Sequence, residues 1–203
     1  MLRTGIILSL FAAIGVSLIA ITSLLTQEKI AANDQAILQQ QIESVLTHIT
    51  YNSSILEDKI QVTDPHLLGS KQPITVYRAY QDNLPVATVF TPIASNGYNG
   101  GIKLLVGMDY KGMITGVRVM EHHETPGLGD KIELEKSPWI LSFDNYSLNY
   151  PSLNHWAVKK DGGDFDQFTG ATITPRAIVQ AVYHCLEYFN QHQQDIFTTP
   201  LEE

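Results

Sequence analysis

Residues 5 to 25 form an uncharged apolar stretch, GIILSLFAAIGVSLIAITSLL, which constrains this chain more than any other feature. About 20 such residues cross the hydrocarbon core of a membrane as a helix, at a rise of about 1.5 Å per residue. A cleaved signal peptide is the alternative, but it requires an apolar core of about 7–15 residues and a small-x-small cleavage site. The stretch is longer, and TSLLTQEK offers no clean site. The sequence therefore favours an uncleaved anchor over residues 1–26.

The charges on either side of this stretch predict its orientation. Arg3 and the amino terminus precede it, whereas Glu28, Lys29 and Asp34 follow it. Positive charge is retained on the cytoplasmic side of a membrane. We therefore expect a cytoplasmic N-terminus and a C-terminal part in a periplasm-like space.

Composition excludes several classes of protein. The net charge of -8 lacks the basic footprint that phosphate contacts need, so no nucleic acid is expected as a partner. Cys185 is the only cysteine among the 203 residues, which excludes a disulfide within the chain and a cysteine-built iron–sulfur or zinc site.

The part that follows the anchor is predicted to be helical at first. Apolar residues recur at helical spacing over residues 27–60, which we interpret as a stalk helix region with a break near residues 51–54. The apolar residues with this spacing are Ile30, Ile37, Leu38, Ile42, Val45, Leu46 and Ile49.

The remaining residues, 61–203, predict an antiparallel-sheet domain. ITVYRAY (74–80) and LPVATVFTPIA (84–94) are rich in β-branched and aromatic residues and are separated by a turn, so they predict a hairpin. A second hairpin is predicted in GIKLLVGMDYKGMITGVRVMEHHE (101–124), around Asp109-Tyr110-Lys111-Gly112. Residues 125–136 begin as a turn and continue as a short helix. The fold class is therefore α+β, with one N-terminal transmembrane helix and helices flanking the sheet.

The last predicted helix has a clear start and one apolar face. Thr174 is suited to be its N-cap and Pro175 its first helical residue. Its apolar face comprises Ile178, Val182, Cys185, Leu186 and Phe189. We expect Cys185 to be a buried apolar residue rather than a redox thiol.

Three loops could form a binding site. FTGAT, residues 168–172, precedes the last helix, where backbone N–H groups and a partial positive charge suit a phosphate and Arg176 adds a cation. Taken alone, these residues are more typical of a plain capped helix start, because capping residues are common at any helix start.

The other two loops are HHETPGLGD (122–130) and NGYNGG (96–101). Pro126 and two glycines make the first a compact turn in which Glu124 and Thr125 could bind a polar ring edge. The adjacent His122 and His123 would point to opposite faces of a strand, so they do not predict a metal pair. In the second loop Tyr98 could stack on a flat ligand, although such a loop alone is most often a turn.

Taken together, these motifs resemble a known family. Asp166-x-x-Thr169-Gly170-Ala171-Thr172 resembles the target sequence of the bacterial flavin transferase, and ETPGLG lies upstream of it. Over essentially its whole length, the chain resembles the G subunit of the Rnf (Rsx) electron transport complex. The C subunit of the sodium-translocating NADH:quinone reductase shares the FMN-binding domain, but its chains are usually longer.

The resemblance implies a covalent flavoprotein. The Thr172 hydroxyl would carry FMN through a phosphoester bond, installed by a separate flavin transferase, while Thr169 and Asp166 would serve recognition. Trp139 could belong to the flavin site, but a large aromatic side chain is more often in the core. The residues expected to contact the flavin are Gly170, Ala171, Glu124, Thr125, Gly127, Leu128, Gly129, Gly97, Tyr98, Asn99 and Gly100.

The resemblance also implies a function. The chain would be an electron-transfer subunit of an inner-membrane complex that couples electron transfer to ion translocation, with other subunits as partners. It would carry no catalytic base and would not be a complete enzyme by itself. Two alternatives remain: an anchored extracytoplasmic sensor or ligand-binding module, and a structural assembly subunit without a cofactor.

Overall fold

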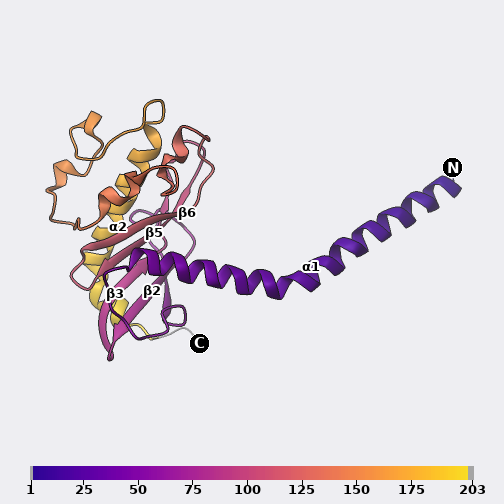
Figure 1. Cartoon of the computed structure of the whole chain (residues 1–203), viewed down its shortest axis with the longest axis horizontal. Coiled ribbons are helices and arrows are strands. Elements are labelled where there is room, and N and C mark those ends of the chain that lie inside the picture. The colour runs from indigo at the N-terminus through magenta and orange to yellow at the C-terminus, as the bar shows by residue number, and fades with distance from the viewer. Residues whose placement is uncertain (1, 201–203) are drawn as a thin grey trace. The chain divides into compact units, whose positions relative to one another are not determined.

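The computed structural model describes residues 2–200. The chain consists of two compact units. The first unit ends at Gln40 and the second begins at Gln41. Figure 1 shows the elements along the chain. They are α1 (Leu2–Val45), β1 (Lys59–Val62), β2 (Ile74–Gln81), β3 (Leu84–Phe90), β4 (Ile93–Ala94), β5 (Ile102–Asp109), β6 (Ile114–Glu121), four short 3-10 helices η1 (Gly129–Ile132), η2 (Pro138–Phe143), η3 (Leu153–His155) and η4 (Lys159–Asp161), and α2 (Ile173–Thr198).

The first unit consists of most of helix α1. Its segment Arg3–Gln27 is long and apolar enough to cross a membrane, judged by length and composition. The large apolar side chains from Ile6 to Leu25 are exposed, as they would be against lipid rather than in a protein core.

Helix α1 ends earlier than its sequence predicts. The apolar pattern indicates helix as far as residues 51–54, but the helix ends at Val45 and residues 46–58 are turns and irregular structure. Thr115 Oγ1 donates to the Val45 carbonyl at 2.6 Å, and Arg118 Nη2 donates to the Ser44 carbonyl at 3.1 Å. Strand β6 thus satisfies the last carbonyl groups of α1, which a continuing helix would otherwise pair internally.

The sheet of the second unit is antiparallel and contains both predicted hairpins. β1, β2, β3 and β5 are neighbours in that order. β4 pairs with Ile102 and Lys103 of β5, before the residues that β3 occupies, and β6 also pairs with β5. Asp82 and Asn83 connect β2 to β3 with φ values of 51° and 64°, the left-handed pair that a type I′ hairpin turn requires. The predicted α+β class is confirmed.

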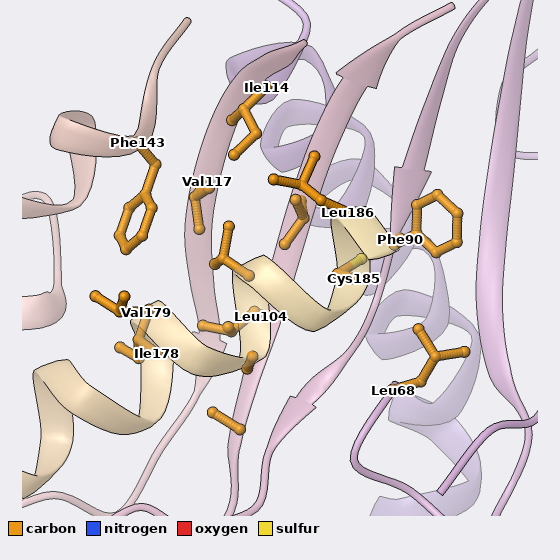
Figure 2. Close-up of a cluster of buried hydrophobic side chains, with 14 of the residues drawn as sticks. Leu68, Phe90, Leu104, Ile114, Val117, Phe143, Ile178, Val179, Cys185 and Leu186 are labelled. Atoms are coloured by element: carbon orange, nitrogen blue, oxygen red, sulfur yellow. The ribbon is translucent and has the colours of Figure 1, made fainter. Parts of the chain in front are cut away.

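Helix α2 covers one face of the sheet and forms the main core with it (Figure 1). Figure 2 shows Ile178, Val179 and Leu186 of α2 beside Leu104 and Val117 of the sheet. The predicted apolar face of α2 is confirmed, because all five of its side chains are buried. Cys185 is one of them, and its burial raises the pKa of the thiol well above its ordinary value.

The opposite face of the sheet receives the last turn of α1. Gly107 of β5 and Gly116 of β6 are paired in the sheet and lie directly against Val45. A Cβ atom at Gly116 would come within 2.9 Å of Val45 Cα, so only glycine permits this approach. Within the second unit, the sheet therefore packs between α2 and the end of α1.

The chain between β6 and α2 adds an aromatic cluster to the core. Phe143, Trp156 and Phe165 pack together, and Trp139 meets Phe143 edge to face. Trp139 is buried, and its Nε1 donates to the Asp166 carbonyl at 2.7 Å. Trp139 is therefore a core residue that fixes the segment in which the Asp166–Thr172 motif begins. The predicted turn and short helix in 125–136 are present and contain η1.

Candidate functional site

The three glycine-containing loops meet around one cavity of about 320 Å³. Tyr98 comes from the loop after β4, the second wall comes from the loop after β6, and the third comes from the start of α2. The residues that line the cavity are Tyr98, Glu124, Thr125, Leu128, Gly129, Gly170, Ala171, Thr172, Ile173 and Thr174. The fold thus brings together three segments that lie far apart in the sequence.

The start of helix α2 differs from its prediction. The helix begins at Ile173, with Thr172 at the N-cap, so the prediction of Thr174 as N-cap and Pro175 as first helical residue is wrong. Phe168 and Ala171 close a tight turn in which Gly170 has a φ of 83°, and this turn starts the helix two residues earlier. Proline is tolerated at its actual place in the first helical turn.

Thr172 holds the N-cap position without acting as a cap. An N-cap residue normally has extended backbone dihedrals and accepts a hydrogen bond from the helix on its side-chain oxygen. Thr172 has helical dihedrals (φ -80°, ψ -21°) and makes no side-chain capping bond. Thr172 is half-buried and lines the cavity, next to the first backbone N–H groups of α2, which have no partner within the helix.

Glu124 connects the three loops. Its side chain is buried, at 4% exposure, and both carboxylate oxygens accept hydrogen bonds. Oε1 accepts from the Asn99 backbone N–H at 3.0 Å, and Oε2 accepts from the Thr174 hydroxyl. Asn99 Nδ2 also lies 3.3 Å from Thr125 Oγ1. A single buried side chain therefore fixes the relative positions of all three walls.

A second set of polar groups supports the Glu124 loop from behind. The Glu124 backbone N–H donates to His122 Nδ1 at 3.1 Å, which leaves His122 Nε2 as the donor to Glu133 at 2.8 Å. The pKa of Glu133 lies below its ordinary value because His122 and then Lys136 donate to it. Lys136 also donates to the buried Asp130 at 2.7 Å and thereby lowers the pKa of that carboxyl group.

Two glycines keep the cavity open and the walls close. A Cβ atom at Gly129 would lie 2.9 Å from Glu124 Cβ and 3.1 Å from Thr174 Oγ1. A Cβ atom at Gly170 would meet Leu128 at 3.4 Å, and its positive φ value disfavours other residues. These close approaches explain why glycine occupies both positions in the motifs.

Several sequence-predicted residues lie outside the cavity wall. The Asp166 side chain is 69% exposed and pairs with Lys159 at 2.7 Å, and Thr169 is exposed on the adjacent turn. Arg176, predicted as a cation for a phosphate, forms a two-pronged ion pair with Asp161 instead. The other residues outside the wall are Gly97, Asn99, Gly100 and Gly127, of which Asn99 acts through Glu124 and Thr125.

Ile173 and Thr174 line the cavity, although the sequence pattern predicts only a helix start at these positions. Thr174 has the residue type of a capping residue, but it is fully buried and its hydroxyl points to Glu124. A threonine inside the first turn of an amphipathic helix, on its buried face, is the signal that could have indicated this role.

Family comparisons agree with this geometry. A family described as the FMN-binding domain matches residues 97–187, which include all three loops apart from Asn96. The chain is thus of the class of FMN-binding domain proteins. A second family, the RnfG N-terminal region, matches residues 1–45.

Curated relatives identify the family over nearly the whole chain. The G subunit of the "Ion-translocating oxidoreductase complex" of Vibrio cholerae serotype O1 is 44% identical, covering 98% of this chain and 94% of the relative. The subunits of the same name from Pseudoalteromonas atlantica and Shewanella loihica are 46% and 43% identical, each covering 98% of this chain and 93% of the relative. The chain belongs to this RnfG family. Membership and the apolar helix together support membrane anchoring.

Proposed function

We propose that this chain is a membrane-anchored electron-transfer subunit that carries FMN covalently on Thr172. It would act within a complex that couples electron transfer to ion translocation, as the names of its relatives indicate. The other subunits of such a complex would be its partners, and a flavin transferase would mature it.

The observation that carries the proposal is the uncommitted hydroxyl group of Thr172. Thr172 occupies a helix N-cap, its hydroxyl group makes no capping bond, and the residue lines the cavity. Thr169, the other hydroxyl of the motif, is exposed and outside that wall. A phosphoester at Thr172 would place the phosphate at the N-terminus of α2, where unpaired N–H groups and the helix dipole favour an anion.

The residues of the cavity fit FMN. The volume of about 320 Å³ is within the usual range for small-molecule sites of about 300–1,000 Å³. Glu124 and Thr125 offer polar groups to a ring edge, while Tyr98, Leu128 and Ile173 offer apolar surface to a flat ring. When bound, FMN supplies the capacity to accept and donate electrons, and the chain's residues hold and orient it.

The exposed part of the motif suits recognition by the flavin transferase. Asp166 and Thr169 lie on the surface next to the cavity segment, and the Asp166 backbone is held by Trp139. An enzyme that modifies Thr172 has to reach this turn from outside, so these side chains are accessible to it.

We further propose the organisation of the chain at the membrane. Residues 1–26 would be the anchor and the following part of α1 the stalk. The periplasmic FMN-binding domain, expected from residue 61, would begin near Gln41, because the second compact unit starts there and β1 (Lys59–Val62) belongs to its sheet. The N-terminus would lie in the cytoplasm of a bacterial inner membrane. A covalent bond retains a cofactor in a compartment where a dissociated flavin would be lost, because the tether keeps its local concentration high.

The test is intact-protein mass spectrometry after denaturation, on protein co-expressed with a flavin transferase. Wild type should gain the mass of one FMN less one water, on the peptide that contains Thr172. Thr172→Ser is the matched control and should also be modified, whereas Thr172→Ala should not be. Flavin that remains on the Thr172→Ala variant after denaturation would show that Thr172 is not the attachment site.

The same experiment separates the alternatives. No mass gain on wild type, with the transferase active on a control substrate, contradicts covalent attachment. Reversible binding of a small anionic ligand would then favour a sensor or binding module. No binding by the folded protein would favour an assembly subunit without a cofactor.

A further inference from the structure

Glu124 is a buried carboxylate that faces the cavity without a cation beside it. Its side chain is 4% exposed and forms part of the cavity wall. Its two oxygens both act as acceptors, one from a backbone N–H and one from the Thr174 hydroxyl. Both carboxylate oxygens are thus held by neutral groups of the chain, and neither is held by a cation.

Three basic side chains from the segments around the cavity pair with carboxylates other than Glu124. Lys136 pairs with Asp130 and Glu133, Arg176 pairs with Asp161, and Lys159 pairs with Asp166. Among residues 2–200, the ion pairs found do not include Glu124. His122 accepts from the Glu124 backbone on Nδ1, so its remaining proton is on Nε2 and directed to Glu133.

A buried charge without a counter-ion is costly to the fold, because hydrogen bonds alone replace the solvation it loses. A glutamine of the same shape could accept from Asn99 through its oxygen and donate to Thr174 through its nitrogen. The local hydrogen bonding therefore requires the shape of this side chain and does not require its charge. A negative charge at Glu124 would therefore act on what the cavity holds and not on the hydrogen bonds around it.

We propose that the negative charge of Glu124 lowers the reduction potential of the flavin in this cavity. Reduction of FMN by two electrons and one proton leaves the ring with one additional negative charge. A fixed negative charge at low local dielectric opposes that gain, and no paired cation cancels its field. The proposal rests on the cavity being the flavin site, but it does not require the bond to Thr172.

The test is the midpoint potential of the flavin-loaded full-length protein, measured by titration with dithionite and reference dyes. Glu124→Gln keeps the shape and removes the charge, so its potential should be higher than that of wild type. Glu124→Asp keeps the charge and should stay close to wild type. Asp161→Asn removes a carboxylate that is paired and outside the cavity wall, so it should shift the potential less than Glu124→Gln.

The inference is overturned if Glu124→Gln leaves the potential unchanged or lowers it. It is also overturned if Glu124→Asp raises the potential as much as Glu124→Gln, because shape rather than charge would then be responsible. A rise confined to Glu124→Gln supports it.

A second measurement makes the outcome independent of covalent loading. The Thr172→Ala variant is titrated with free FMN, once oxidised and once reduced by dithionite. The ratio of the two dissociation constants measures how much the cavity disfavours the reduced form, which is the same electrostatic effect. Glu124→Gln should shift this ratio in favour of the reduced form, and an unchanged ratio contradicts the inference. A cavity that binds neither form overturns the inference, whereas loss of loading at Thr172 alone overturns only the attachment site.

Discussion

The two ends of helix α2 are built in opposite ways. At the C-terminal end, Arg78 of β2 is 3% exposed and donates through Nη1 to the carbonyls of Ile196 at 2.9 Å and Thr199 at 2.6 Å. Its Nε pairs with Asp58 at 2.5 Å. At the N-terminal end, Thr172 leaves its capping bond unmade and opens onto a cavity.

The difference indicates which end serves the fold and which serves a ligand. A helix end leaves backbone groups unpaired, and a protein satisfies them with side chains, water or a ligand. The sheet satisfies the C-terminal carbonyls of α2 through Arg78, and it does the same for α1 through Arg118. In the described residues, the side-chain bond at the N-terminus of α2 runs from Thr174 to Glu124, and the first N–H groups of the helix would be available to the phosphate of the proposed flavin.

Removal of Arg78 should have the largest effect on stability. Arg78→Met leaves two helix carbonyls and Asp58 without their donor, and we expect a loss of about 3 kcal/mol in the free energy of unfolding. Denaturant unfolding followed by circular dichroism measures it. Lys159→Met, which breaks the exposed pair with Asp166, is the matched control and should change little. Equal losses of stability from the two substitutions would show that Arg78 does not stabilise the C-terminal end of α2 in solution.

Thr174→Val should have the next largest effect. The substitution keeps the volume but removes the donor to Glu124, and we expect a loss of about 1–3 kcal/mol, since an oxygen of a buried carboxylate is left unpaired. Thr174→Ser should retain most of the stability because it keeps the hydroxyl group. A double-mutant cycle with Glu124→Ala measures the coupling, and additive losses would show that the two side chains do not interact in solution.

Local patterns in the sequence were sufficient for the two hairpins and the buried face of α2, but not for β1, which begins at Lys59 inside the region predicted as stalk helix. Strand alternation, turn residues and helical spacing act over a few residues, and the Asp82–Asn83 turn needs no distant partner. The predicted end of α1 was wrong because a distant strand decides it. The predicted start of α2 was wrong because the Phe168–Ala171 turn begins the helix earlier, and because the Thr174 hydroxyl bonds a distant carboxylate instead of capping. Thr115 lies 70 positions after Val45, and Glu124 lies 50 positions before Thr174.

The candidate site was predictable to a similar extent. Its three loops were recognisable as glycine-containing motifs, and their family resemblance predicted that they contact one ligand. The motifs did not distinguish residues that line the cavity from residues that only hold the lining residues in place. Asn99 acts through its backbone N–H, a group that every residue except proline carries, so no side-chain pattern could indicate that role.

The Asp161–Arg176 pair should make a smaller contribution, with a defined pH dependence. The hydrogen bond from Arg176 lowers the pKa of Asp161 below its ordinary value of 3.8. The stabilisation is therefore fully present above that value and is lost as the pH falls through the lower value of the folded state. Asp161→Asn should reduce stability slightly at pH 7 and not at all in strong acid, as measured by thermal unfolding across that range.

The same pair tests whether Arg176 serves the ligand. Because its guanidinium group is held by Asp161 and lies outside the cavity wall, Arg176→Gln should leave flavin incorporation at the wild-type level. Loss of incorporation in this variant, with the fold intact, would mean that Arg176 exchanges Asp161 for the phosphate.

Thr172→Ala should have the smallest effect on the stability of the unmodified protein. Loss of a threonine N-cap usually costs about 1 kcal/mol, because the hydroxyl oxygen accepts from the helix. Thr172 makes no such bond, so we expect a change within about 0.5 kcal/mol, the range of surface substitutions. Denaturant unfolding of the flavin-free variant and wild type measures it. A loss of about 1 kcal/mol would show that Thr172 caps α2 in solution. Side chains of the protein would then satisfy both ends of the helix. An unchanged stability, together with complete loss of covalent flavin, would separate the role of this hydroxyl group from the fold.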